Sequence, residues 1–145
     1  MQLSSLVPGL NGETGEQPVT GFAIDHRKIA PGNIFGAFRG AKFNGEDFIE
    51  AAVAAGAIAV VARPGAQVEG LVHIMDEEPR RLFARMAARY FTPTPANVAA
   101  VTGTNGKTST AELTRQLWRM DGYSSASIGT LGVTTADDQI KTGLT

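Results

Sequence analysis

The sequence contains no cysteine, which excludes disulfide bonds and cysteine-ligated metal sites. Its two histidines, His26 and His73, are too few to form a zinc site by themselves. The formal net charge is −1 and no large block of one charge occurs. This balance argues against a module that binds nucleic acid by neutralising phosphates.

Membrane and secretion signals are also missing. The longest uncharged apolar run, residues 51–62, is too short to span a bilayer. The N-terminus, "MQLSSLVPGLNGE", has no basic segment followed by an apolar core, so it does not read as a signal peptide. We therefore expect a soluble cytoplasmic protein that binds neither nucleic acid nor membrane.

The order of apolar patterns along the chain predicts an α/β fold. Apolar residues make up 43% of the sequence, enough for a packed core. Strand patterns alternate with helical ones: strands at 19–25, 34–38, 57–62 and 71–75, and helices at 46–55 and 78–90. The continuous apolar run at 57–62 is typical of a buried parallel strand.

Pro93 and Pro95 interrupt this alternation, because each removes a backbone donor and favours an extended chain. We predict a domain boundary here, with one domain over residues 1–92 and a second over 93–145. In the second, 97–103 reads as a strand and 107–120 as a helix with Leu113, Leu117 and Met120 facing inward. Another strand begins within 124–130. About 50 residues make only the first βαβ part of a P-loop domain, so we expect this domain to be truncated.

The stretch "VTGTNGKTST", residues 101–110, joins the predicted strand to the predicted helix. Gly103 and Gly106 let the turn wrap closely, so that backbone N–H groups at the helix start can point at one anion. Lys107 adds a full positive charge, and Thr108 offers a hydroxyl to Mg²⁺. The usual P-loop has a glycine where Val101 stands, so the motif is a shortened one. The pattern predicts a loop for a nucleoside triphosphate; the alternative is a surface turn that caps a helix.

This shortened loop closely resembles the ATP loop of the Mur ligase family, cytoplasmic enzymes that join amino acids to a peptidoglycan precursor. "GTNGKT" and the later "SIGTLG", 127–132, resemble the tripeptide synthetase branch (MurE) more than the MurF branch. "GFAIDHRKIAPGNIFGAFRGAKFNGEDFIEAAVAAGAIAVV", 21–61, resembles the UDP-binding first domain that both branches share. The related folylpolyglutamate synthetases have a similar loop but lack that domain.

The resemblance implies roles for particular residues. Those implied to contact the UDP-sugar are Ile24, His26, Ala41, Lys42 and Phe43. His26 stands where the family usually has serine, and Lys42 and Phe43 could instead be solvated and core residues, respectively. Those implied to bind ATP are Gly103, Thr104, Asn105, Gly106, Lys107, Thr108 and Ser109. Lys107 would act in catalysis, Thr108 would bind Mg²⁺, and Thr145 would begin the segment that contacts the muramoyl group.

The implied reaction is an ATP- and Mg²⁺-dependent ligation in peptidoglycan synthesis. A cytoplasmic monomer would add the third amino acid, meso-diaminopimelate or L-lysine, to UDP-N-acetylmuramoyl-L-alanyl-D-glutamate. The family's remaining active-site residues lie beyond position 145, so we expect the fragment alone to be inactive. Two alternatives stay open: a MurF-type ligase, and a nucleotide-binding module without catalysis.

Overall fold

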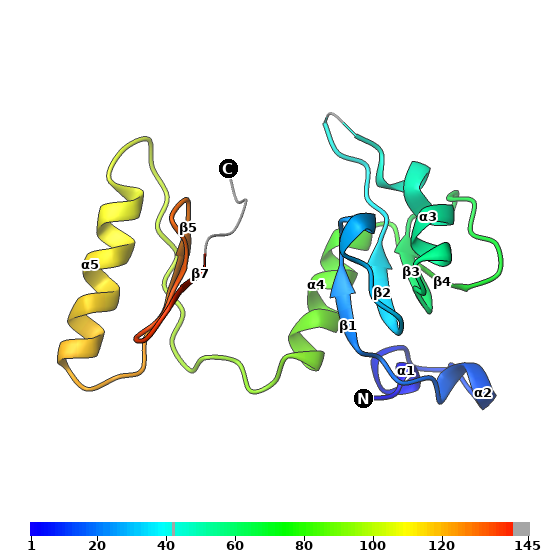
Figure 1. Cartoon of the computed structure of the whole chain (residues 1–145), viewed down its shortest axis with the longest axis horizontal. Coiled ribbons are helices and arrows are strands. Elements are labelled where there is room, and N and C mark those ends of the chain that lie inside the picture. Colours follow the sequence, from blue (N-terminus) through cyan, green and yellow to red (C-terminus); the bar gives the residue numbers. More distant parts are fainter. Residues whose placement is uncertain (42, 141–145) are drawn as a thin grey trace. The chain divides into compact units, whose positions relative to one another are not determined.

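The computed structural model describes residues 1–41 and 43–140. The chain divides into two compact units, Met1–Thr94 and Pro95–Thr145, and each is described here by itself (Figure 1). Two of the predicted site residues, Lys42 and Thr145, lie outside the described residues. Among the helices that are described, none is long and apolar enough to cross a membrane.

The first unit is built on a four-stranded parallel sheet in the order β1-β2-β3-β4. Its strands are β1 (Gly21–Ala23), β2 (Asn33–Gly36), β3 (Ala59–Ala62) and β4 (Val72–Met75). The 3₁₀ helix η1 (His26–Lys28) follows β1, while η2 (Gly45–Phe48) and α3 (Ile49–Ala54) connect β2 to β3. The helix α4 (Pro79–Tyr90) follows β4. The predicted α/β class and the buried parallel strand within 57–62 are thus confirmed.

Side chains that alternate along the strands divide the core of this unit into two clusters. Ile34, Ala59 and Val61 pack with Phe83 and Met86 of α4. The alternate residues of the same strands, Phe35, Val60 and Ala62, point to the opposite face. There they pack with Ile49 and Ala52 of α3. Because both faces of the sheet are covered, the central strand β3 is apolar throughout, as parallel strands often are. Figure 1 shows α3 and α4 on the two sides of the strands.

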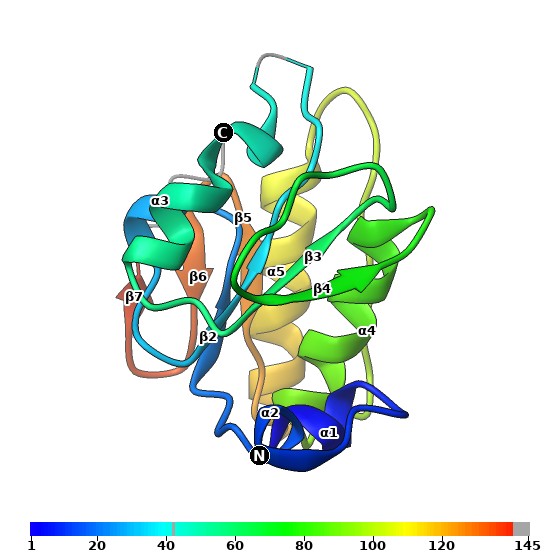
Figure 2. The ribbon, with the colours of Figure 1, turned by 90° about the vertical axis from the view of Figure 1, so that its right-hand side faces the viewer.

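Two short helices, which the sequence pattern does not predict, precede the sheet. They are α1 (Leu3–Leu6) and α2 (Gly12–Gly15), which lie together beside the N-terminus in Figure 2. Each has only four residues, too few to show a helical period. Leu3 and Leu6 are nevertheless buried in the cluster beneath α4, so α1 closes one end of that cluster.

The second unit consists of one helix and a small antiparallel sheet. The helix α5 (Lys107–Met120) has the predicted bounds. The sheet, in the order β5-β6-β7, is formed by β5 (Ser127–Gly129), β6 (Gly132–Thr134) and β7 (Gln139–Ile140). Residues 97–103 are not a strand, because a strand needs a hydrogen-bonded neighbour and this segment pairs with none among the described residues. A parallel βαβ unit is therefore not formed in this part.

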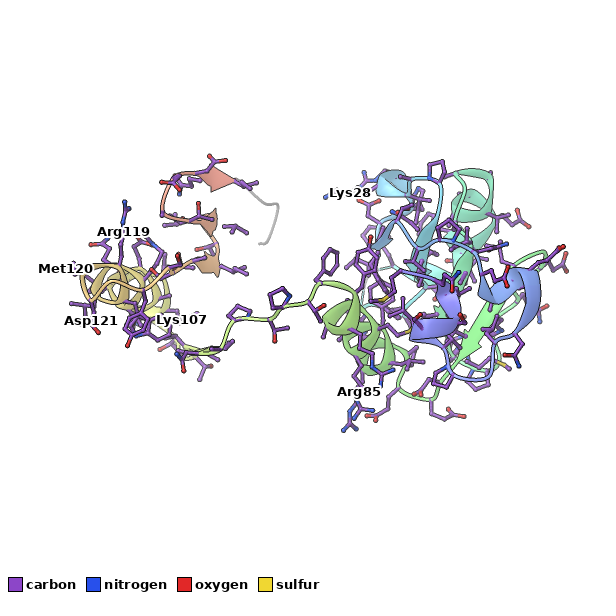
Figure 3. The ribbon with its side chains drawn as sticks, turned by 90° about the horizontal axis from the view of Figure 1, so that it is seen from below. Lys28, Arg85, Lys107, Arg119, Met120 and Asp121 are labelled. Atoms are coloured by element: carbon purple, nitrogen blue, oxygen red, sulfur yellow. The ribbon has the colours of Figure 1, made fainter. Side chains whose placement is uncertain are left out.

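The prediction that the apolar side chains of α5 face inward is wrong. Leu113, Leu117 and Met120 are 59%, 63% and 83% exposed, and Met120 projects from the end of the helix in Figure 3. The helix turns a polar stripe toward the sheet instead, which includes Glu112 and the buried Arg115. The periodicity of the sequence identified a helix with an apolar face, but it could not identify which face the antiparallel sheet would cover.

Candidate functional site

The loop before α5 contains two glycines in backbone conformations that favour glycine. Gly103 and Gly106 have φ angles of +138° and +79°, a region that residues with a Cβ rarely adopt. Gly106 is the N-cap of α5, and within 1–41 and 43–140 no side chain caps this end of the helix. The first intrahelical bond runs from the N–H of Thr110 to Gly106 O, at 2.9 Å. The N–H groups of residues 107–109 precede that bond, and their segment is exposed, so they are free to bind an anion.

Lys107 folds back over this loop. Its Nζ donates a hydrogen bond to Gly103 O and a second one, of 3.3 Å, to Thr104 O. The ammonium group is therefore held at the loop, where it neutralises carbonyl dipoles. A phosphate bound to the loop would offer the same ammonium a fully charged acceptor, and charge-assisted hydrogen bonds are roughly twice as strong as neutral ones.

The residues that surround Thr108 fit a cation that prefers oxygen ligands. Its Oγ1 lies 3.2 Å from Oγ1 of Thr130, in the turn between β5 and β6, and either hydroxyl can donate the hydrogen bond. Both residues are exposed. No group of three or more His, Cys, Asp or Glu side chains able to hold a metal occurs among the described residues. Hydroxyl oxygens are ligands of the kind that Mg²⁺ takes, in small number, together with water and substrate phosphates.

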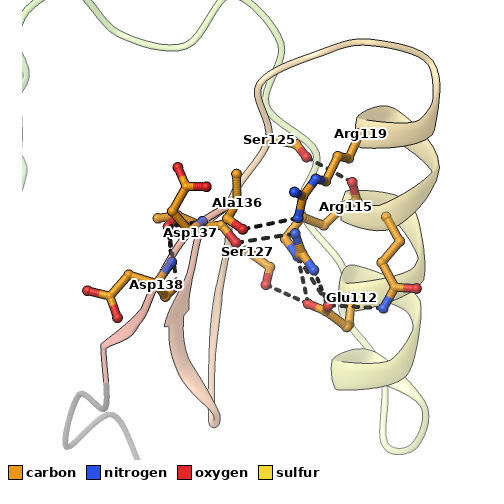
Figure 4. Close-up of polar contacts among 10 residues, drawn as sticks. Glu112, Arg115, Arg119, Ser125, Ser127, Ala136, Asp137 and Asp138 are labelled. Carbon is orange, nitrogen blue, oxygen red and sulfur yellow. Dashed lines mark hydrogen bonds and ion pairs between the residues drawn. The ribbon is translucent and has the colours of Figure 1, made fainter.

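A polar network holds α5 against the small sheet behind this loop (Figure 4). Arg115 binds both oxygens of Glu112 through Nε, at 3.1 and 3.0 Å. The hydroxyl of Ser127 in β5 donates to Glu112 at 3.1 Å, and the hydroxyl of Ser125 donates to Arg115 O at 2.8 Å. Arg119 adds a bond of 3.0 Å to Ala136 O. The hydrogen bonds from Arg115, followed by those from Gln116 and Ser127, lower the pKa of Glu112 to about 2.

In the first unit, the loop after β1 is closed by an Asp-x-Arg turn. Asp25 accepts hydrogen bonds from Arg27 N at 3.1 Å and from the Arg27 guanidinium at 2.9 and 2.8 Å. These bonds lower the pKa of Asp25 to about 2. His26 stands between the two residues, and its ring stacks on Phe48 of η2 with centroids 4.4 Å apart and planes 5° from parallel. The stack joins the loop after β1 to the segment that follows β2; sequence reasoning identified His26 but not its partner.

The segment after β2 forms a short hairpin of its own. Gly40 N donates to Phe43 O and Gly45 N donates to Phe38 O, both at 2.8 Å. Phe38 anchors the base of this hairpin, edge-on against Phe83 at a centroid distance of 5.3 Å. Ala41 is exposed and Phe43 is 75% exposed, so the alternative that Phe43 is a core residue is excluded. The predicted nucleotide-sugar residues Ile24, His26, Ala41 and Phe43 thus follow β1 and β2, two neighbouring parallel strands, at the same edge of the sheet.

A cavity of about 400 Å³ opens at the same edge, beyond the ends of β2 and β3. Glu46, which is 11% exposed, binds Arg63 at 2.6 Å and Arg39 at 3.5 Å within its lining. The hydrogen bond from Arg63, followed by the charges of Arg63 and Arg39, lowers the pKa of Glu46. Arg80 adds a guanidinium 5.1 Å from the Phe38 ring centroid. Sequence reasoning missed this cluster, because its charges come from four separate segments of the chain.

Comparison with known families matches two models to the sequence. The catalytic-domain model of the Mur ligase family matches residues 18–120, and the Mur ligase middle-domain model matches residues 101–145. Together they include the loops that follow β1 and β2 and the whole segment 101–110.

The sequence is also similar to curated proteins of the same family. The UDP-N-acetylmuramoyl-L-alanyl-D-glutamate–2,6-diaminopimelate ligase of Zymomonas mobilis subsp. mobilis is 60% identical over 137 residues, which are 94% of this chain and 28% of that protein. The ligase of the same name from Bradyrhizobium diazoefficiens is 47% identical over 127 residues, 88% of this chain and 26% of that protein. The chain spans about a quarter of the length of these curated relatives.

Solved structures agree with the sequence matches. A structure of a UDP-N-acetylmuramoyl-L-alanyl-D-glutamate–2,6-diaminopimelate ligase superimposes with a TM-score of 0.72 at 27% identity, covering 96% of this chain and 29% of that one. The MurF ligase of Thermotoga maritima in complex with ADP gives a TM-score of 0.60 at 28% identity, covering 74% of this chain and 24% of that one.

Proposed function

The chain belongs to the Mur ligase family, and we propose that it supplies the nucleotide-sugar-binding and phosphate-binding parts of a cytoplasmic ligase. The substrate would be UDP-N-acetylmuramoyl-L-alanyl-D-glutamate, and the amino acid added would be 2,6-diaminopimelate rather than L-lysine. The names of the relatives support this choice of amino acid. The observation that carries the proposal is the exposed glycine loop at the start of α5, with Lys107 held over it.

The proposed reaction overcomes the poor reactivity of a carboxylate. The D-glutamate carboxylate attacks the γ-phosphorus of ATP, and ADP leaves, which gives an acyl phosphate. The amine of diaminopimelate then attacks the acyl carbon, and the tetrahedral intermediate collapses to a peptide bond with release of phosphate and a proton. Residues 103–109 would hold the β- and γ-phosphates through backbone N–H groups, while Lys107 would stabilise the negative charge on the transferred phosphoryl group.

Thr108 would be the protein ligand of Mg²⁺ at this loop. The bound ion would supply electrostatic stabilisation of the phosphoryl oxygens. The exposed hydroxyl of Thr108 supports this assignment, since its oxygen is a suitable ligand for such a cation.

The first unit would bind the UDP part of the substrate. Its two candidate loops follow adjacent parallel strands, and ligands commonly bind outside the carboxyl ends of such strands. The exposed Phe43 offers a ring for uracil to stack on, and the His26–Phe48 stack fixes the orientation of an imidazole that can donate a hydrogen bond.

A graft tests the proposal, because the Zymomonas mobilis ligase is 60% identical to this chain over the matching segment. The matching part of that ligase is replaced by this chain, and formation of the diaminopimelate-containing product is measured. We expect ATP-dependent ligation at a rate comparable with that of the parent. A graft that folds and binds ATP but forms no product would contradict the proposal and favour a nucleotide-binding module without catalysis.

A further inference from the structure

In the second unit, a second hydroxyl lies beside that of Thr108. It belongs to a residue outside the glycine loop. Thr130 stands in the turn that joins β5 to β6, where Gly129 and Gly132 form the last pair of the ladder. Its Oγ1 lies 3.2 Å from Oγ1 of Thr108, although the two residues are 22 positions apart in the sequence.

This juxtaposition results from the polar stripe on α5. Residues 108, 112, 115 and 119 are spaced i, i+4, i+7 and i+11, so they share one face of the helix. Glu112 is tied to Ser127 in β5, and Arg119 to Ala136 beyond β6. These bonds fix the sheet along the helix, and the β5–β6 turn consequently arrives at the first turn of α5.

We infer that Thr130 is a positioning residue for the Thr108 hydroxyl and orients it for a phosphate-bound cation. This inference rests on the phosphate-loop function proposed above. A hydroxyl that binds a cation through its oxygen lone pair must direct its proton elsewhere, and Thr130 Oγ1 is an acceptor within reach.

ATP affinity measured with and without Mg²⁺ distinguishes the loss of one hydroxyl from a loss of folding, because unfolding would weaken both. Thr130→Val keeps the shape of the side chain but removes the hydroxyl. We expect this variant to bind ATP without Mg²⁺ as the unmodified chain does, and to lose about 2–10-fold of the affinity that Mg²⁺ adds, the value of one hydrogen bond between neutral groups. Thr130→Ser keeps the hydroxyl and should restore the Mg²⁺ effect.

The experiment is a calorimetric titration of the 145-residue chain with ATP, with and without MgCl₂. Amide NMR spectra check that each variant is folded. Thr134→Val in β6 is the matched control, because it makes the same change in the same sheet away from the turn. A change of less than twofold in the Mg²⁺-dependent affinity of Thr130→Val would overturn the inference. So would a Thr130→Ser variant that behaves like Thr130→Val.

The variant Lys107→Ala distinguishes a failure of the inference about Thr130 from a failure of the proposed phosphate-loop function. If Lys107→Ala binds ATP as well as the unmodified chain does, the phosphate loop itself is wrongly assigned and the inference about Thr130 falls with it. If Lys107→Ala loses binding while Thr130→Val keeps the full Mg²⁺ effect, only the inference about Thr130 is overturned.

Discussion

The hydroxyl of Ser127 donates a 3.1 Å hydrogen bond to the carboxylate of Glu112, and this contact ties β5 to the helix that follows the glycine loop. Glu112 is already bound by Arg115 within the same helix. Each of these bonds is made to the charged form of the carboxylate. The part of the sheet's attachment to α5 that runs through Ser127 therefore depends on Glu112 staying ionised.

We predict that Glu112 titrates near pH 2 in the folded chain, well below its ordinary pKa of 4.5. Because its pKa is lower in the folded state, the stabilisation from Glu112 is fully present above about pH 5 and is lost as the pH falls from there toward 2. The side-chain carboxyl ¹³C shift of Glu112, followed by NMR from pH 6 to pH 2, reports the midpoint. A midpoint at pH 4 or higher would contradict the network, and Glu112→Gln should remove the signal without unfolding α5.

In the first unit, we predict that Arg63 contributes more to stability than Arg81 does. Arg63 pairs with the largely buried Glu46, whereas Arg81 pairs with Glu78 at a site where both side chains are more than half exposed. Arg63→Ala should lower the free energy of unfolding by about 1–2 kcal/mol, since it leaves a desolvated carboxylate with a weaker partner. Arg81→Ala should cost about 0–0.5 kcal/mol. Urea unfolding at pH 7 measures both, and equal losses would refute the difference.

Gly45 should tolerate no side chain, because the hairpin after β2 brings its Cα against the backbone of Phe38. A Cβ added there would lie 2.6 Å from Phe38 N and 2.8 Å from Phe38 O. Gly45→Ala should therefore cost about 1–3 kcal/mol of stability. Gly65→Ala is the matched control, since its Cβ would meet nothing closer than an Arg63 nitrogen at 3.7 Å. A Gly45→Ala variant as stable as the control in urea would show that the hairpin is not built as described.

The His26–Phe48 stack leads to a prediction about nucleotide recognition. Phe48→Leu should weaken binding of UDP-N-acetylmuramoyl-L-alanyl-D-glutamate by roughly 2–10-fold, the value of one aromatic pair. Phe91→Leu, a change of another partly exposed ring in the same unit, should have little effect. Calorimetry with this nucleotide measures both variants. Calorimetry of the unmodified chain with the adenosine analogue tests whether the site selects uracil. Equal affinity for the two nucleotides would reject a uracil-selective site.

Local sequence signals predicted the parts of the fold that depend on nearby residues. The bounds of α5 followed from Gly106, from the first hydroxyl-rich turn and from the apolar period up to Met120. The parallel strand β3 followed from its continuous apolar run, because both faces of the sheet are covered. Phosphate-loop chemistry could be proposed from the sequence for the same reason, since glycines, lysine and hydroxyl are adjacent in the chain.

Features that depend on distant residues were not predicted. Residues 97–103 have a strand pattern, yet a strand exists only where another one pairs with it. The exposure of Leu113 and Leu117 could not be foreseen, because the sheet that covers the other face of α5 is attached through polar side chains. Thr108 and Thr130 meet only because the hydrogen bonds of Glu112 and Arg119 set the position of the sheet along the helix.

The central claim is that residues 103–109 bind the phosphates of ATP for ligation, and Lys107 is the most direct test of it. The measurement is ATP turnover by the Zymomonas mobilis graft with both acceptor substrates, alongside calorimetry with the nucleotide sugar alone. We predict that Lys107→Ala slows turnover about 10²–10³-fold, as expected when one electrostatic contact is lost from a transition state. Lys107→Arg should also fail, because a planar guanidinium does not replace a compact ammonium. Binding of the nucleotide sugar, assigned to the first unit, should stay unchanged. Near-normal turnover by Lys107→Ala in the folded graft would contradict the assignment of this loop.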